Sequence, residues 1–151
     1  DGYTHKYEDF KFKKNVLKAL DYCRKKNYYI FIVTNQAGIA KGFYTINDFI
    51  NLHLKISKNL KKKNIYFDDI KFSPFHPKGV VKIYKKTSNF RKPGNLMIKE
   101  LIKKWHINKN KSFMIGDKKS DYLAARKSKI YFEFDIDNLY KQVSKIIKKF
   151  A

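Results

Sequence analysis

The sequence is poor in cysteine, proline, glycine and acidic residues, and these shortages narrow the possible classes of protein. Its 151 residues include one Cys, three Pro, six Gly and 13 Asp or Glu, against 35 Lys or Arg. The single cysteine, Cys23, excludes an internal disulfide and a cysteine-rich metal site. No stretch approaches the roughly 18 apolar residues of a membrane span, and no apolar segment follows a basic start. We therefore expect a cytoplasmic protein without a membrane partner.

Apolar and aromatic residues are abundant, and together they predict a folded domain. Hydrophobic residues make up 43% of the chain and aromatic residues 17%, which is too much apolar surface for a disordered protein. The length suits one domain with a real core, so we predict a single domain over residues 1–151. The net charge of +22 would attract any polyanion, but the lysines are spread along nearly every predicted helix. We expect a monomer whose main partner is not nucleic acid.

Apolar periodicity predicts strands that alternate with helices. Apolar runs predict strands at 28–33, 112–115 and 130–134, and a short strand is predicted near 69–72. Helical spacing predicts helices near 16–23, 46–60, 98–105, 120–128 and 139–150. Thr45 and Asp48 resemble a capping box at the start of the second helix. This order predicts an α/β fold, with a mostly parallel sheet between two layers of helices. Residues 73–95 hold all three prolines and show no periodicity, which predicts a long functional loop.

Polar residues follow the first predicted strand, at the edge where ligands bind in such sheets. Thr34 offers a hydroxyl, and Thr34 and Asn35 expose backbone N–H groups as the strand ends. Gly38 and Gly42 would let the backbone wrap closely around an anion. This turn suits a phosphate, although a capped strand-to-helix connection explains the same residues equally well.

Acidic and basic residues mark two further candidate positions. Asp117 follows another apolar strand and a glycine, where a carboxylate suits a hard cation such as Mg²⁺. Asp121 favours the N-terminus of the next helix, so we assign the metal to Asp117 and a structural role to Asp121. Arg91 and Lys92 precede a helix and together could clamp a phosphate. By itself, such a pair carries little weight in a chain with 35 basic residues.

Read together and in this order, the segments VTNQAGIAKG, HP, RKPG and MIGDKKSD resemble the motifs of the haloacid dehalogenase-like (HAD-like) phosphatase superfamily. More narrowly, they resemble its heptose-bisphosphate phosphatase and histidinol-phosphatase branch, from DGYTHKYEDFKF to about Ile130. The resemblance implies a Rossmann-like three-layer fold and a Mg²⁺-dependent hydrolase acting on a small sugar phosphate.

The resemblance is compatible with several substrates. The opening DGYTHKYEDF and the long loop favour the 7-phosphate of D-glycero-D-manno-heptose 1,7-bisphosphate, and histidinol phosphate is the nearest alternative. DNA-end phosphatases of the polynucleotide kinase type have similar TNQ and RKP segments. The segment GDKKSD, however, does not look like the fourth motif of that group.

The resemblance also assigns roles to individual residues. Thr34 would bind the transferring phosphoryl group, Lys92 would balance the charge on nucleophile and phosphate, and Asp117 would hold Mg²⁺. Arg91 lies beside Lys92 at a position that contacts the substrate and completes the catalytic group. Further positions implied to bind the substrate are Asp1, Gly2, Tyr3, Asn35, Gln36, Ala37 and Lys118.

The chain departs from the family pattern at the nucleophile. In the family an aspartate attacks phosphorus, and a second aspartate two residues later acts as the acid and base. Both belong to a DxDG motif at the end of the first, central strand. The 151 residues contain no such motif, and the family spacing would place it roughly ten residues before Asp1. We therefore predict no phosphatase activity for these residues alone, whether the sequence is incomplete or belongs to a relative that only binds.

A second departure concerns zinc. Many members of this branch hold a structural Zn²⁺ in the long loop through a CxH…CxC set. Ser73, Phe75, Ser88 and Phe90 occupy the matching positions here, and neither serine nor phenylalanine is a useful zinc ligand. His76 alone cannot hold the metal. We predict a loop without zinc, in which Phe75 and Phe90 pack against each other.

Overall fold

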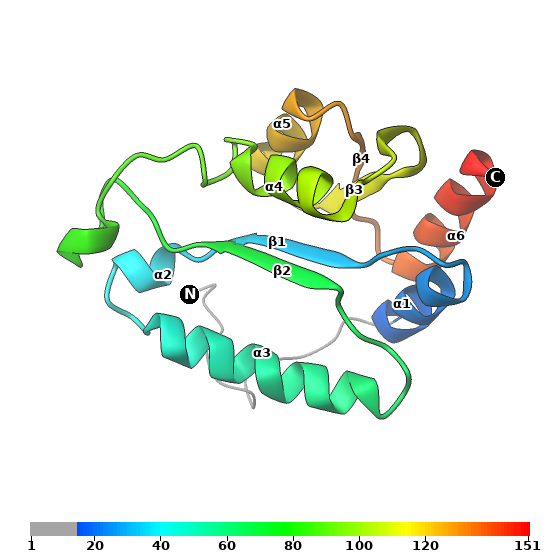
Figure 1. Ribbon diagram of the computed structural model, residues 1–151, viewed down its shortest axis with the longest axis horizontal. Coiled ribbons are helices and arrows are strands. Elements are labelled where there is room, and N and C mark those ends of the chain that lie inside the picture. The colour runs from blue at the N-terminus through cyan, green and yellow to red at the C-terminus, as the bar shows by residue number, and fades with distance from the viewer. Residues whose placement is uncertain (1–14) are drawn as a thin grey trace. The chain divides into compact units, whose positions relative to one another are not determined.

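The computed structural model describes residues 15–151, which alternate between helices and strands (Figure 1). Four strands and six α-helices are present in this part of the chain. The α/β class with parallel strands is therefore confirmed. In chain order the elements are α1 (Val16–Lys25), β1 (Phe31–Asn35), α2 (Ala37–Ala40), α3 (Ile46–Lys61), β2 (Asp69–Ser73), the 3₁₀ turn η2 (Lys82–Tyr84), α4 (Leu96–Trp105), the 3₁₀ turn η3 (Lys109–Lys111), β3 (Phe113–Gly116), α5 (Lys119–Lys127), β4 (Tyr131–Phe134) and α6 (Leu139–Phe150).

The strands form two pairs, β1 with β2 and β3 with β4. Strands β3 and β4 are parallel, with Phe113 opposite Tyr131 at one end. Strands β1 and β2 also run in the same direction. The N–H of Asp68 donates to the carbonyl of Ile30 before the pair (2.7 Å), and the N–H of Gln36 donates to the carbonyl of Ser73 at its far end (2.8 Å).

The first strand begins later than predicted, at Phe31 rather than at residue 28. The N–H of Tyr28 donates to the carbonyl of Cys23 (3.0 Å), and so belongs to the turn that closes α1. The N–H of Ile30 donates to the Asp68 carboxylate (2.8 Å). Residues 28–30 therefore belong to the connection between α1 and β1. The strand extends instead to Asn35, so Thr34 and Asn35 lie within it. The short helix α2 that follows had no signal in the apolar pattern.

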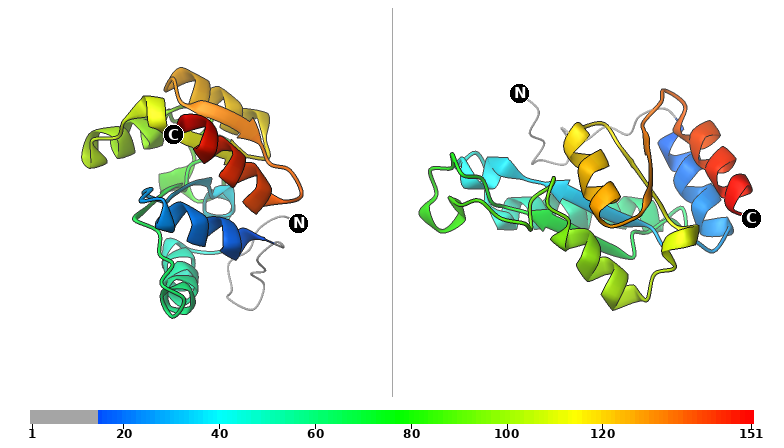
Figure 2. Two further views of the ribbon diagram at one scale, coloured as in Figure 1. Left: turned by 90° about the vertical axis from the view of Figure 1, so that its right-hand side faces the viewer. Right: turned by 90° about the horizontal axis from the view of Figure 1, so that it is seen from above.

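Backbone contacts divide the described chain into two compact units, the first made of 15–32, 44–70 and 136–151. In this unit α1 packs along α6 (Figure 2). The capping box of α3 is confirmed, because Asp48 N donates to Thr45 Oγ1 (3.1 Å) and Thr45 N donates to Asp48 Oδ2 (2.9 Å). The predicted apolar stripe of α3 supplies much of the core. Its cluster consists of Leu52, Ile56, Leu60 and Ile65, with Leu17, Leu20 and Phe67 packed against it.

The second unit contains residues 33–43 and 71–135, and with them every candidate site residue that the structure describes. Helix α5 lies against β3 and β4, and the rings of Tyr122 and Phe132 meet at 5.7 Å between centroids. The long loop contains only η2, and it binds back to α2. The N–H groups of Val80 and Val81 donate to the carbonyl of Ala40 (2.7 and 2.9 Å). A Cβ at Gly79 would lie 2.8 Å from that carbonyl oxygen, so glycine is required for this approach.

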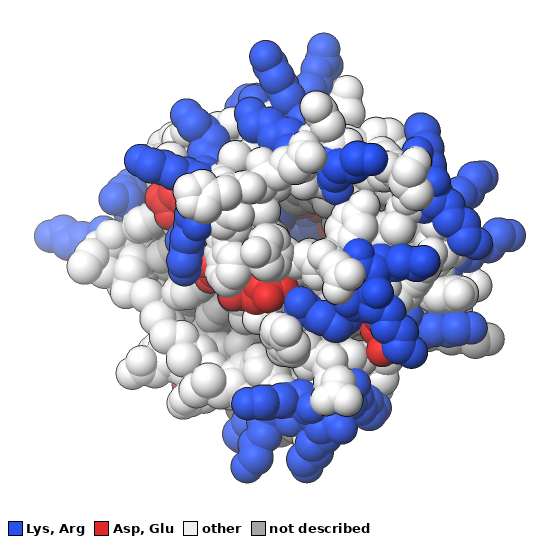
Figure 3. Space-filling view, turned by 45° about the vertical axis from the view of Figure 1, so that its right-hand side comes forward, with Lys and Arg blue, Asp and Glu red and all other residues white. Residues whose placement is uncertain are grey.

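Lys and Arg side chains greatly outnumber acidic ones on the face shown in Figure 3, in keeping with the net charge of +22. In residues 15–151, none of the helices combines the length and apolar character that a membrane crossing needs.

Candidate active site

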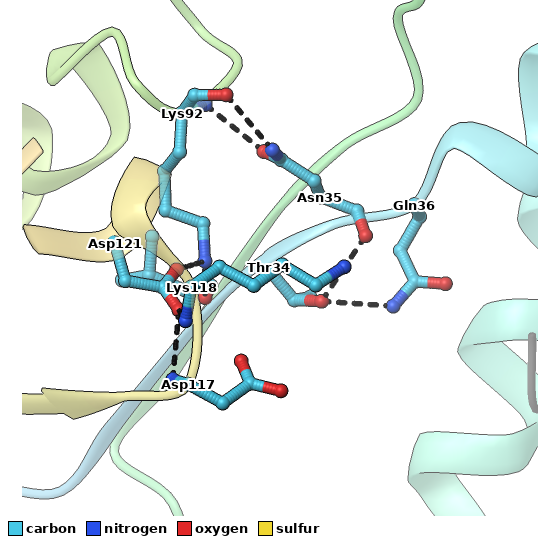
Figure 4. Close-up of polar contacts among 8 residues, drawn as sticks. Thr34, Asn35, Gln36, Lys92, Asp117, Lys118 and Asp121 are labelled. Carbon is cyan, nitrogen blue, oxygen red and sulfur yellow. Dashed lines mark hydrogen bonds and ion pairs between the residues drawn. The ribbon is translucent and has the colours of Figure 1, made fainter. Parts of the chain in front are cut away.

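Lys92 is a buried cation held at both ends by β1 (Figure 4). Its side chain is 9% exposed, and its Nζ donates to the carbonyl of Val33 (2.9 Å) and to Asp121 Oδ1 (2.5 Å). Its backbone N–H donates to Asn35 Oδ1 (3.0 Å), and its backbone carbonyl accepts from Asn35 Nδ2 (3.0 Å). An ammonium group has three protons, so the bonds within the described residues leave one for a ligand. The structure thus joins the TNQ and RKPG motifs directly.

The carboxylate of Asp121 connects Lys92 to the carboxyl end of β3. Its Oδ1 pairs with Lys92, and its Oδ2 accepts from the N–H groups of Asp117 (3.2 Å) and Lys118 (3.1 Å). The second set of bonds confirms the structural role predicted for Asp121 at the start of α5. The ion pair with Lys92 was not predicted. Hydrogen bonds to both carboxylate oxygens are what a buried ion pair needs to offset the loss of water.

Gly116 is the sequence signal that could have revealed this arrangement. A Cβ at Gly116 would lie 2.5 Å from Asp121 Oδ2 and 2.6 Å from Asp121 Cβ. Only glycine lets the carboxylate fold back onto the end of β3. In this chain, Gly116 followed five residues later by Asp121 is thus the local pattern of a bound carboxylate as well as of a helix N-terminus.

Asp117 is the carboxylate available to a metal at this edge. Its side chain is exposed at the carboxyl end of β3, whereas both oxygens of Asp121 are engaged. Residues 15–151 contain no group of three or more His, Cys, Asp or Glu that could hold a metal ion. Mg²⁺ does not need such a cage, because it is commonly bound by one or two carboxylates together with phosphate oxygens and water. Asp117 therefore fits a Mg²⁺ ion that shares its other ligands with a phosphate.

Thr34 lies half-buried at the end of β1, and Gln36 orients its hydroxyl. Gln36 Nε2 donates to Thr34 Oγ1 (2.9 Å), whereas the bond from Thr34 Oγ1 to the carbonyl of Asn35 is long at 3.4 Å. An ordinary O–H···O bond is about 2.7–2.8 Å. The hydroxyl proton is therefore weakly held and can turn toward an incoming phosphoryl oxygen. Ala37, next in the chain, is buried in α2.

The long loop adds positive charge to the second unit. Its residues 73–95 contain six Lys or Arg and no Asp or Glu. Arg91 Nη1 donates to the carbonyl of Phe75 (3.4 Å). Burial and the nearby cations Arg91, Lys41 and Lys78 lower the pKa of His76, whose Nδ1 accepts from the N–H of Lys78 (3.0 Å). The neutral ring therefore carries its proton on Nε2. This stretch favours an anionic ligand.

Two serines, Ser73 and Ser88, occupy loop positions that the family resemblance matched to a zinc-ligand pattern. Ser73 Oγ accepts from the N–H of Phe75 (3.4 Å), and Ser88 Oγ accepts from the N–H of Phe90 (3.0 Å). Such bonds close tight turns without a metal. The ring of Phe75 meets the ring of Tyr84 at 6.4 Å between centroids, and its packing on Phe90 stays a prediction. The residues at these positions do not fit zinc.

The structure brings together predicted residues from the end of β1, from the long loop and from the turn after β3. The hydrogen bonds link Thr34, Asn35 and Gln36 on one side with Lys92 and the turn at Asp117 and Lys118 on the other (Figure 4). The side chain of Lys118 is exposed, and the backbone N–H of Lys118 donates to Asp121 Oδ2. The predicted substrate-facing residues Asp1, Gly2 and Tyr3 lie outside the described residues.

Comparisons of the sequence with known proteins point to phosphatases. A family model described as polynucleotide kinase 3 phosphatase matches residues 2–147. The D-glycero-beta-D-manno-heptose-1,7-bisphosphate 7-phosphatase of Rhodopseudomonas palustris is 35% identical over 147 residues, which cover 95% of this chain and 82% of that protein. The corresponding enzyme of Photorhabdus laumondii is 36% identical over 129 residues, covering 85% and 69%.

Solved structures share the fold. A HAD-like phosphatase from Mesorhizobium loti superposes with a TM-score of 0.87 at 18% identity, covering 100% of this chain and 80% of that one. The D,D-heptose 1,7-bisphosphate phosphatase from B. bronchiseptica, complexed with magnesium and phosphate, gives 0.82 at 15% identity, covering 99% and 90%. The predicted Rossmann-like fold is confirmed by these likenesses.

Proposed function

Because the chain belongs to the polynucleotide kinase 3 phosphatase family of HAD-like phosphatases, we propose that it is a Mg²⁺-dependent phosphomonoesterase acting on a sugar phosphate. The substrate we propose is D-glycero-D-manno-heptose 1,7-bisphosphate, hydrolysed at its 7-phosphate, the reaction for which two relatives are named. One observation carries the proposal. The Lys92 ammonium is buried between the Val33 carbonyl and Asp121, where the motifs of β1 and β3 meet. We further propose a cytoplasmic monomer.

The residues of this chain would bind and neutralise the phosphoryl group. Thr34 would donate its hydroxyl proton to a phosphoryl oxygen, and the third proton of the Lys92 ammonium would donate to another. Fixed charges and donors of this kind stabilise negative charge that builds up during transfer. Asp117 would hold Mg²⁺, which when bound screens the repulsion between the phosphate and the attacking carboxylate. In this family that carboxylate belongs to a DxDG motif, which the 151 residues do not contain.

The charge of the long loop supports the bisphosphate over histidinol phosphate. The six cations and the absence of acidic residues over 73–95 would attract a second phosphate. The same charges would repel the cationic amino group of histidinol phosphate. A 3′-phosphorylated DNA end is the second candidate, because the family description and the net charge of +22 both fit it.

The experiment is a comparison of kcat/KM for heptose 1,7-bisphosphate, histidinol phosphate and a 3′-phosphorylated oligonucleotide, measured on the product of the complete reading frame. We expect heptose bisphosphate to be preferred by on the order of 100-fold, with activity lost in EDTA and restored by Mg²⁺. Lys92→Met should abolish turnover, whereas Lys99→Met, an exposed lysine of α4, should leave it unchanged. Preference for the oligonucleotide would reassign the protein to DNA-end repair, and Mg²⁺-independent turnover would overturn the proposed chemistry.

A further inference from the structure

We propose that Asn35 is a positioning residue for Lys92, and that it serves the reaction by fixing this lysine and not by contact with the substrate. Its side-chain amide binds the backbone of Lys92, 57 residues further along the chain. The kinetic part of this inference rests on the proposed function. The structural part concerns only the position of the ammonium group, and can be tested without turnover.

The two hydrogen bonds are complementary, because the amide side chain offers one donor and one acceptor side by side. Asn35 Nδ2 donates to the Lys92 carbonyl, and Asn35 Oδ1 accepts from the Lys92 N–H, both at 3.0 Å. A neighbouring β-strand pairs with a residue in the same manner, with one donor and one acceptor. Exchanging the oxygen and nitrogen of the amide would set donor against donor and acceptor against acceptor. The partners therefore fix the orientation of the amide and direct it at Lys92.

The position of the backbone controls the position of the ammonium because the side chain between them is flexible. Strand β1 holds Lys92 at both ends, through Asn35 at the backbone and through the Val33 carbonyl at Nζ (2.9 Å). Asp121 supplies a third anchor from α5. If the backbone anchor is lost, the segment that carries Lys92 can shift. The distance from its backbone to the Val33 carbonyl and to Asp121 then changes, and the ammonium group moves. A misplacement of about 1 Å can cost about 100-fold in rate.

Two substitutions test the amide of Asn35: one removes both of its hydrogen bonds, and the other removes only its N–H donor. Asn35→Ala removes both bonds, whereas Asn35→Asp keeps the shape and the acceptor but sets a second carboxylate oxygen against the Lys92 carbonyl. Both should lower kcat by about 10- to 100-fold, with KM within about twofold of the wild type. The control is Asn138→Ala, which removes a comparable side-chain bond (3.1 Å to Lys141 N) at the start of α6 and should leave kcat unchanged.

A spectroscopic measurement tests the same claim without catalysis. A buried ammonium with two acceptors should give a slowly exchanging ¹⁵Nζ signal for Lys92 in the 151-residue chain. We expect Asn35→Ala and Asn35→Asp to shift this signal or to broaden it by faster exchange, and Asn138→Ala to leave it in place. An unchanged Lys92 signal in both Asn35 variants would overturn the proposal, even if the protein proved to have another substrate.

Kinetics give a second, independent way to reject the inference. If Asn35 instead binds the substrate, its variants will raise KM by tenfold or more while kcat stays within about twofold of wild type. That outcome would overturn the positioning role and leave the proposed function standing. If the wild-type protein hydrolyses no phosphomonoester, the proposed function is rejected. The NMR signal of the Lys92 ammonium would still decide the role of Asn35.

Discussion

Asp121→Asn is the substitution that most directly tests the buried ion pair. The change keeps the size of the side chain but removes the only carboxylate that pairs with the Lys92 ammonium in the described chain. The new asparagine side chain would also present one NH₂ group, either to the ammonium or to the backbone N–H groups of Asp117 and Lys118, and in both cases donor would face donor. The variant thus leaves a buried cation without a carboxylate partner, with the Val33 carbonyl and at most one amide oxygen as its acceptors.

The expected loss of unfolding free energy in Asp121→Asn follows from the burial of the Lys92–Asp121 ion pair. The side chains of Lys92 and Asp121 are 9% and 6% exposed, and removal of one partner of such a pair costs about 3–5 kcal/mol. Because asparagine still offers one acceptor, we expect the lower end, about 3 kcal/mol of unfolding free energy. For a chain of this size, that loss corresponds to a fall in Tm of roughly 6–12 °C.

The assay is urea unfolding at pH 7, followed by the fluorescence of the single tryptophan, Trp105, with the m-value as a check on two-state behaviour. The matched control is Asp21→Asn, which removes an ion pair of similar length (2.9 Å to Lys25) whose side chains are 40% and 76% exposed. An exposed pair one helical turn apart is worth about 0.3–0.5 kcal/mol.

A double-mutant cycle decides whether the cost is electrostatic. In a Lys92→Met background there is no buried ammonium to leave unpaired, so Asp121→Asn should cost at least about 2 kcal/mol less than it does alone. A buried electrostatic pair is refuted if Asp121→Asn costs no more unfolding free energy than Asp21→Asn, or if the effects of Asp121→Asn and Lys92→Met are simply additive.

Three further predictions concern the thiol, a buried histidine and the long loop. Burial raises the pKa of Cys23 to about 11, so at pH 8 the thiol should react with Ellman's reagent only in denaturant; rapid labelling of the native protein would contradict this. Burial also lowers the pKa of His53, whose Nδ1 has no hydrogen-bond partner among the described residues. The unfolded state then binds more protons below about pH 6.5, so stability is complete above this pH and falls as the pH drops toward the folded pKa. His53→Phe should flatten this slope in urea titrations at pH 7 and 5.5, and an unaltered slope would show that other groups cause it. Finally, the serine turns at Ser73 and Ser88 should make the Tm insensitive to a zinc chelator, and elemental analysis that finds one zinc per chain would refute the assignment.

The sequence alone determined the class of fold, most of the element bounds and the family. These properties depend on local patterns, such as the apolar stripe of α3, the capping box of Thr45 and Asp48, and strand ends marked by Thr34 and Asp117. Their physics is short-range, since periodicity fixes which face is buried and a cap satisfies backbone groups three residues away. The order of the motifs along the chain then identified Thr34, Lys92 and Asp117 as candidate site residues.

Only the tertiary structure decided how these residues are held. Lys92 depends on Asn35 and Asp121, which lie 57 and 29 residues away, and no local pattern specifies a pairing over such distances. The same is true of the contact between the rings of Phe75 and Tyr84, which no pattern in the sequence indicated. A buried ammonium must find acceptors wherever the folded chain brings them, because water cannot reach it to replace them. The partners of this lysine are therefore a property of the folded backbone, and the sequence indicates only that it needs them.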